Sequence, residues 1–285
     1  MDVFANILPC GKRLHLQHGP IDLIIGAEGD RQSAFFAAKN RFTTVLKELV
    51  VELPKLRLPM NADVSSPLGS IAQRMDNAVR PLAQGVFVTR MAAVAGSVAD
   101  AILDAMQTAT LSRAYVNNGG DIALHLTESQ SFTLAMVGYD GSDLGRVTIH
   151  HDDPIRGIAT SGRHGRSFSL GIADSITVLA ANAASADVAA TLIANSVDLA
   201  GHHAIKREPA SHLDDTSDLG NLPVVVSCDP LSLHDKTRAL SFGRSLADTY
   251  IRRDIISGAA LFLQGYSETT CPAQFSLPQR TLNHA

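Results

Sequence analysis

The stretch RAYVNNGGDIALHL, residues 113–126, decides the fold class of this 285-residue chain. Short apolar segments flank its Asn and Gly residues, which is the pattern of two strands joined by a turn. Two more strand-like segments follow, SFTLAMVGYDG (131–141) and GRVTIHH (145–151), with no helical pattern between them. Because the strands come in a run instead of alternating with helices, the sequence predicts an α+β fold with a mainly antiparallel sheet backed by helices.

Helices and further strands are predicted on both sides of this run. A hairpin over 12–29 turns at Gly19-Pro20, and a helix over 31–53 is ended by Pro54. The other expected elements are a short helix over 69–83, a helix over 86–106 with a strand-like start, a strand over 166–181, a helix over 182–201 stopped by Gly201, a surface loop over 201–222, a buried strand over 222–230, a helix over 236–253 and a final strand over 255–265. We expect residues 1–270 to form one domain and residues 271–285 to form a flexible tail.

The composition excludes several classes of function. The net charge is −4 and the basic residues are scattered, so nucleic acid is not an expected partner. Three widely spaced cysteines make neither a disulfide framework nor a zinc site. The first residues do not resemble a signal peptide, and no uninterrupted apolar run is long enough to span a membrane. We therefore expect a soluble, cytoplasmic protein without a membrane partner, and the oligomeric state, including a homo-oligomer, stays open.

Two glycine-containing turns are candidate ligand-binding segments. In the first, Asn118, Gly119, Gly120 and Asp121 would let a ligand approach the backbone, because glycine has no Cβ. In the second, Thr160, Ser161 and Gly162 offer hydroxyls and backbone amides to an anion, and Arg163 or Arg166 adds positive charge. An ordinary polar turn is the alternative for each segment taken alone. Neither of the common nucleotide loops, GxGxxG or GxxxxGK[ST], is present.

A third candidate lies in the alanine-rich helix expected over 182–201. Asp187 and Thr191 are four residues apart and would lie on one face of that helix. A carboxylate and a hydroxyl one turn apart are suitable ligands for Mg²⁺, whereas the alternative is that Asp187 bonds a neighbouring backbone group. No Lys or Arg lies within two turns of Asp187 on this helix, so its partner would be a metal ion or a residue from another segment such as Arg163.

Taken in order, the segments NNGGD, GIATSG and SITVLAANAASADVAAT resemble those of the ApbE family of flavin transferases. The resemblance covers residues 86–200 and implies a T-fold-like α+β domain. It implies that FAD is cleaved with Mg²⁺ and that FMN is transferred to a Thr or Ser of a partner protein. By the same resemblance, Asn118 to Asp121 and Thr160 to Arg163 would bind the cofactor, Asp187 would be catalytic, and Asp187 with Thr191 would bind the metal.

The chain also departs from that family. An H-x-x-D-P-x-x-G segment is expected between ATSG and the helix, but RSFSLG stands in its place. The chain therefore resembles a shorter, cytoplasmic and poorly characterised branch, also marked by FVTRMAAVAG (87–96). Three functions follow as hypotheses: a flavin- or nucleotide-binding transferase, a non-catalytic protein that binds a small molecule on the same scaffold, and a sulfur-handling protein that uses Cys228 or Cys10. If the first holds, residues 119–121, 160–162 and 187–191 are expected to line one pocket.

Overall fold

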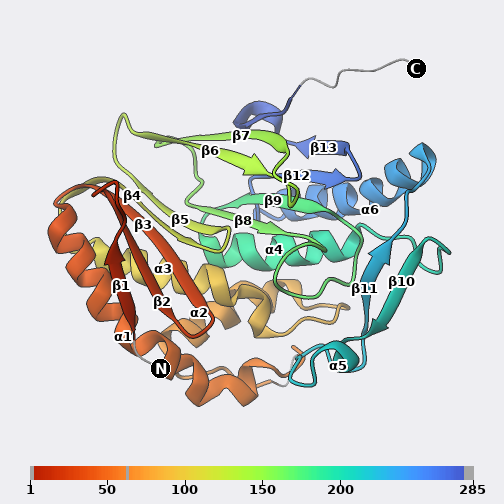
Figure 1. Cartoon of the computed structure of the whole chain (residues 1–285), viewed down its shortest axis with the longest axis horizontal. Helices are drawn as coiled ribbons and strands as arrows, with labels where there is room; N and C mark the ends of the chain where they lie inside the picture. Colours follow the sequence, from red (N-terminus) through yellow and green to blue (C-terminus); the bar gives the residue numbers. More distant parts are fainter. Residues whose placement is uncertain (1–2, 62–63, 279–285) are drawn as a thin grey trace.

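The computed structural model describes residues 3–61 and 64–278. Within these ranges a nine-stranded sheet forms the centre of the molecule, and every neighbouring pair of strands in it is antiparallel (Figure 1). The α+β, mainly antiparallel prediction is confirmed. The strand order is β1 (Phe4–Ile7), β2 (Arg13–His18), β3 (Ile21–Gly29), β4 (Leu111–Asn118), β5 (Asp121–Leu126), β8 (Gly157–Ser161), β9 (Ser175–Ala180), β12 (Gly258–Leu263) and β13 (Tyr266–Thr270).

A layer of helices covers one face of this sheet (Figure 1). Its helices are α1 (Arg31–Leu56), α3 (Val94–Met106), α4 (Ala183–Ser196) and α6 (Leu233–Arg252), and α2 (Ser70–Val79) packs on α1, α3 and α4. The helix α3 packs on β4 and β5, α4 packs on β8 and β9, and α6 packs on β12 and β13. Between helices and sheet lies the larger apolar core, to which the strands contribute side chains such as Val116, Ala123 and Val178.

The other face of the sheet carries a second, smaller core. A three-stranded sheet covers it, formed by β6 (Ser131–Val137), β7 (Asp143–His150) and β14 (Phe275–Ser276). Successive residues of a strand point to opposite faces, so Ile122 and Leu124 enter this second core while Ala123 enters the first. Of the tail expected over 271–285, Phe275 and Ser276 pair with β7, and residues 279–285 lie outside the described residues.

Two glycines bring α3, α4 and β8 into unusually close contact. A Cβ added to Gly96 of α3 would lie 2.2 Å from the carbonyl oxygen of Ala183, at the start of α4. A Cβ added to Gly157 of β8 would lie 2.0 Å from the backbone of Asn182, which caps the same helix. Any larger residue would force these elements apart. The first turns of α3 and α4 therefore meet beside β5 and β8.

Several predicted boundaries were wrong. Pro54 lies in the last turn of α1, which continues past it to Leu56. The strand expected over 166–181 is confined to β9, and residues 162–174 form a loop between β8 and β9. The helix α4 ends at Ser196, before Gly201. The loop expected over 201–222 contains β10 (Ile205–Pro209) and α5 (Ala210–Leu213), and β10 pairs with β11 (Pro223–Cys228), which is only partly buried.

Candidate functional site

The turn between β4 and β5 depends on its two glycines. Gly119 has φ 67° and Gly120 has φ 113°, both in the region that side chains disfavour. The Gly120 amide donates to Oδ1 of Asn117 over 2.9 Å, which fixes the turn. Asn118 and Asp121 therefore stand opposite each other at the ends of the two strands.

Asn118 and Asp121 are buried and incompletely bonded. Both lie on the helix side of the sheet, because Val116 and Ala123, two residues away along each strand, enter the core beneath the helices. Asn118 Nδ2 donates to the carbonyl of Ala95 over 3.1 Å. In the described part of the chain, the Oδ1 atoms of Asn118 and Asp121 are buried without a hydrogen-bond partner. Buried oxygens of this kind are rare in folded proteins and indicate a missing ligand, ion or water.

Asp187 approaches this pair from α4. Its Oδ2 accepts a hydrogen bond of 3.0 Å from the Gly96 amide, in the first turn of α3. An amide at a helix N-terminus stabilises negative charge, so the fold holds Asp187 as an oriented oxygen donor. The side chain is half-buried, and therefore stays within reach of solvent.

The charges of Asp121 and Asp187 act on each other. Burial raises the pKa of Asp121 to about 7, although a hydrogen bond from the Thr160 backbone and the charge of Arg166 oppose the rise. Burial, followed by repulsion from Asp121, raises the pKa of Asp187 well above its usual value. Among the ion pairs of residues 3–61 and 64–278, none includes either carboxylate. The two acids thus form a carboxylate pair that no ion pair with a described Lys or Arg side chain balances.

The ATSG segment contributes less than the sequence suggested. Ala159 and Ser161 face the helix side of the sheet, towards the carboxylate pair, whereas Thr160 faces the other side. The Thr160 hydroxyl lies 3.3 Å from that of Thr177. The two hydroxyls therefore point to opposite faces of the sheet, because adjacent residues of a strand alternate, and the role of Thr160 and Ser161 in ligand binding stays a prediction.

Gly162 and Arg163 are engaged within their own loop. Gly162 packs against the backbone of Asp174, where an added Cβ would lie 2.4 Å from the carbonyl oxygen. The Arg163 amide donates to Ala173 over 2.9 Å, and its guanidinium donates to Oδ1 of Asp174 over 2.8 and 2.9 Å. Asp174, and not Asp187, is therefore the carboxylate that pairs with Arg163 among the described residues, and a role of Arg163 in cofactor binding stays a prediction.

The other expected metal ligand, Thr191, is half-buried on α4, one turn beyond Asp187. Sequence reasoning missed Ser97, whose Oγ is buried without a partner among the described residues, next to Gly96. Its only sign in the sequence is the run of small residues in α3. No group of three or more His, Cys, Asp or Glu side chains in the described ranges is placed to hold a metal ion. A cation here would thus need further oxygen ligands beyond the two acids.

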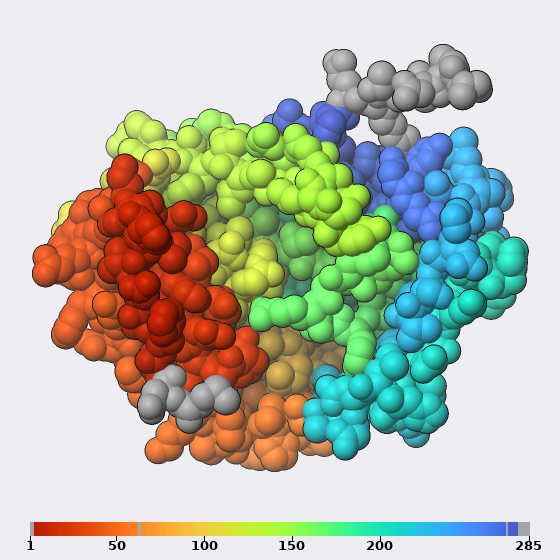
Figure 2. Space-filling model, viewed as in Figure 1, coloured from red at the N-terminus to blue at the C-terminus, as the bar shows by residue number. Residues whose placement is uncertain are grey.

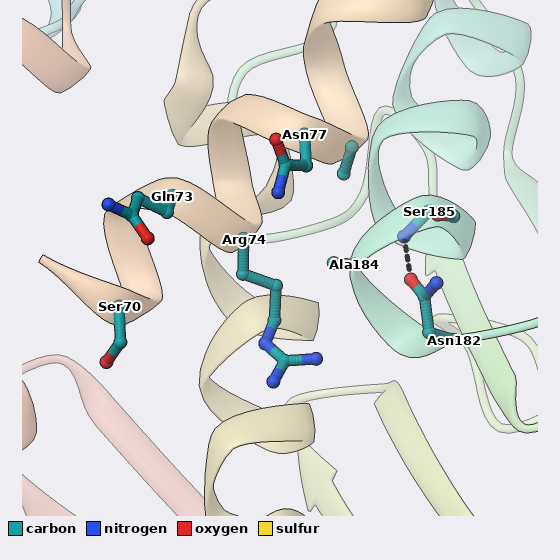
Figure 3. Close-up of a pocket in the computed structure, with 8 residues that line it drawn as sticks. Ser70, Gln73, Arg74, Asn77, Asn182, Ala184 and Ser185 are labelled. Atoms are coloured by element: carbon teal, nitrogen blue, oxygen red, sulfur yellow. Dashed lines mark hydrogen bonds between the residues drawn. The ribbon is translucent and has the colours of Figure 1, made fainter. Parts of the chain in front are cut away.

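Two cavities among the described residues are not lined by the predicted site residues. One, of about 440 Å³, lies between α2 and the start of α4 (Figure 3). It is lined by Ser70, Gln73, Arg74, Asn77, Ala78, Asn182, Ala184 and Ser185. Another, of about 580 Å³, lies beside the residues 198–203 that follow α4.

Figure 2 shows a further hollow between the N-terminal strands, coloured red, and the β8–β9 loop, coloured green, with the β4–β5 turn in yellow at its margin. The single pocket formed by the three motifs stays a prediction.

Comparison with known proteins agrees with the resemblance. A family model described as AbpE bacteria matches residues 5–269, and the chain belongs to this family. It is 31% identical over 180 residues to a UPF0280 protein of Archaeoglobus fulgidus, covering 63% of this chain and 73% of that protein. It is 36% identical over 191 residues to a UPF0280 protein of Methanosphaerula palustris, covering 65% and 77%.

Two solved structures are also similar. One is an ApbE protein of Thermotoga maritima, with a TM-score of 0.49, 10% identity and coverage of 94% of this chain and 96% of that one. The other is a flavin transferase ApbE of Vibrio cholerae, with a TM-score of 0.37, 12% identity and coverage of 95% and 97%. Among the described residues of the present chain, no helix has the length and apolar character needed to cross a membrane.

Proposed function

We propose that this chain binds FAD together with Mg²⁺ at the carboxylate pair Asp121–Asp187 and transfers FMN to a hydroxyl acceptor. The observation that carries the proposal is that the fold sets these two acids close enough to repel each other, Asp121 buried and Asp187 half-buried, with neither in an ion pair with a described Lys or Arg side chain. Separating two such charges from water is costly unless a positive charge balances them. A divalent cation held by Asp121 and Asp187 would supply that balance.

The oxygen donors around the pair suit Mg²⁺. This ion takes oxygen ligands, and proteins usually hold it through one or two carboxylates together with substrate phosphates and water. Asp121 and Asp187 would supply the carboxylates, and the unbonded Oδ1 of Asn118 and the hydroxyl of Thr191 are further candidates. When bound, Mg²⁺ would neutralise charge on the pyrophosphate of FAD.

The remaining residues would orient the ligand. The Gly119-Gly120 turn lets a phosphate approach the backbone closely, and the Gly96 amide keeps Asp187 aimed at the site. In the reaction, the acceptor oxygen bonds to the FMN phosphorus, the bond from that phosphorus to the bridging oxygen breaks, and AMP leaves. The acceptor proton passes to a base, for which Asp187 is our candidate. Membership of the family supports this assignment.

The test is incubation with FAD and MgCl₂, followed by chromatography for AMP and FMN and mass spectrometry of added acceptor peptides. We expect Mg²⁺-dependent AMP release, lost in Asp187→Asn and retained in Asp152→Asn, a control that removes a charge from an exposed side chain. Tight binding of FAD without AMP would instead indicate a non-catalytic binding protein on the same scaffold. Failure of calorimetry to detect FAD binding with Mg²⁺ would overturn the proposal.

The sulfur hypothesis gains less support. Burial raises the pKa of Cys228, which keeps its thiol protonated and weakly nucleophilic at neutral pH. A hydrogen bond from Arg13 lowers the pKa of the exposed Cys10 to about 7, but Cys10 lies in the β1–β2 turn and not among the residues of the carboxylate pair. Alkylation of the cysteines should leave FAD binding unchanged.

A further inference from the structure

The loop of residues 162–174, which we call the strap, occupies the place where the family pattern has H-x-x-D-P-x-x-G. Both ends of the strap are fixed together by the Arg163–Asp174 ion pair of 2.8 Å. Near its start, the ring of His164 stacks on Tyr139 from the β6–β7 turn, with centroids 3.6 Å apart and planes 18° apart. The strap is thus held on one side by the smaller sheet, and it borders the hollow shown in Figure 2.

On its other side, the strap places Arg166 against the β4–β5 turn. A Cβ added to Gly119 would lie 2.3 Å from Nη2 of Arg166, so the guanidinium rests on this glycine. Its Nη1 donates to the carbonyl of Pro20, in the β2–β3 turn, over 3.3 Å. Arg166 therefore reaches across from the strap to two turns that come from a distant part of the sequence.

The charge of Arg166 has no carboxylate partner. No Asp or Glu in the described ranges forms an ion pair with it, whereas Arg163, Arg90 and Arg207 each have one. Arg166 is still close enough to Asp121 for its charge to lower the pKa of that acid. A positive group thus stands at the rim of a site whose interior is acidic. A phosphate oxygen bound by a cation on the acids would lie within the field of this guanidinium.

We propose that Arg166 is an anion-binding residue that grips phosphate oxygens of a diphosphate group held over the Gly119-Gly120 turn. The guanidinium presents a planar set of donors that matches two phosphate oxygens at once. The ligand class is a diphosphate, such as the pyrophosphate of a dinucleotide. This inference rests on the proposed function for the position of the cation. The residue that it assigns, Arg166, lies in the strap, where this chain departs from the family pattern.

Calorimetric titration of inorganic pyrophosphate with Mg²⁺ tests it, using the full chain. We expect the wild type to bind, Arg166→Ala to bind at least about 10-fold more weakly, and Arg166→Lys to lie between them, because lysine keeps the charge and loses the planar fork. Arg252→Ala is the matched control, since this arginine bonds only within α6. Arg166 is exposed and bonds only a backbone carbonyl, so Arg166→Ala should melt close to the wild type.

Equal affinity of Arg166→Ala and wild type for pyrophosphate would overturn the inference, as would absence of pyrophosphate binding by the wild type. The two proposals fail separately. If FAD does not bind but pyrophosphate binding depends on Arg166, the proposed function is wrong and the inference stands. If FAD and pyrophosphate bind equally to wild type and Arg166→Ala, the inference is wrong and the proposed function stands.

Discussion

Two pairs of charged groups in this molecule, Asp76–Arg90 and Asp121–Asp187, are partly or wholly buried, but only the first is an ion pair. Arg90 is fully buried and donates to Asp76 over 2.6 Å, and to the carbonyls of Lys55 and Ser65. Burial alone would raise the pKa of Asp76, but Arg80 and Arg90 lower it below its usual value. In the second pair, both pKa values are raised.

The difference separates a structural pair from a binding site. Evolution of a stable fold favours complete pairing of buried charge, as around Arg90, because an unpaired buried charge lowers stability. The carboxylate pair Asp121–Asp187 has no such ion pair among the described residues. We therefore expect it to lower the stability of the free protein, and we expect a bound ligand to restore that stability. We also expect mutation of the first pair to lower the stability of the protein, and we expect the second pair to make that stability depend on ligands and pH.

The largest effect is expected at the structural pair. Arg90→Met removes the buried guanidinium and leaves two carbonyls and part of Asp76 unpaired, so unfolding stability should fall by about 3–5 kcal/mol. Urea unfolding measures this loss, which should be equal with and without Mg²⁺. A stability within about 1 kcal/mol of the wild type would remove the contrast between the two pairs.

The second effect concerns the cation. Mg²⁺ at 100 times its Kd should stabilise the wild type by about 2.7 kcal/mol and should not stabilise Asp187→Asn. Without Mg²⁺ at pH 8 the variant should be at least as stable as the wild type, because an Asn oxygen still accepts from the Gly96 amide. Thermal melts compare the two proteins. A variant that is equally destabilised in both conditions would show that Asp187 has only a structural role.

The third effect is a dependence on pH. In the free protein, Asp121 holds its proton up to a pH of about 7, whereas the unfolded chain releases it near its usual, lower pKa. Since the unfolded state then binds fewer protons, stability should fall as pH rises through this window, by up to about 1.4 kcal/mol per pH unit. The stability of Asp121→Asn relative to the wild type should therefore increase between pH 5 and pH 7. A difference that does not change with pH would contradict the raised pKa.

The smallest effect is expected at the β4–β5 turn. Gly119→Ala places a side chain at φ 67° and against the Arg166 guanidinium, so we expect a loss of about 1 kcal/mol and a displaced Arg166. Affinity for Mg²⁺-pyrophosphate should fall, and adding Arg166→Ala should weaken it little further. Fully additive losses in the double variant would show that Gly119 and Arg166 act independently.

The local pattern was enough to predict much of the fold. Alternation and turn glycines predicted the β4–β5 hairpin and the run of strands, and helical spacing predicted α1, α3 and α6. Errors fell where tertiary contacts outweigh local preference. The apolar residues Ile172 and Ala173 are buried in a loop and not in a strand, because α4 and β12 enclose that loop. The helix α4 ends before Gly201, and residues at its end accept hydrogen bonds from the same loop, Asn195 from Leu170 and Val197 from Ile172.

By itself, the sequence determined the fold class, the family and the three segments from which the candidate site is built, because each depends on residues that are near neighbours in the chain. Only the tertiary structure decided which side chains of those segments meet. Thr160 and Ser161 lie on opposite faces of the sheet, and Arg163 forms an ion pair with Asp174. The guanidinium of Arg166 lies against Gly119. The tertiary structure also brought Asp121 and Asp187 within range of each other's charge, with no ion-paired Lys or Arg among the described residues. Charge balance in a buried site depends on partners from distant segments, which local spacing does not encode.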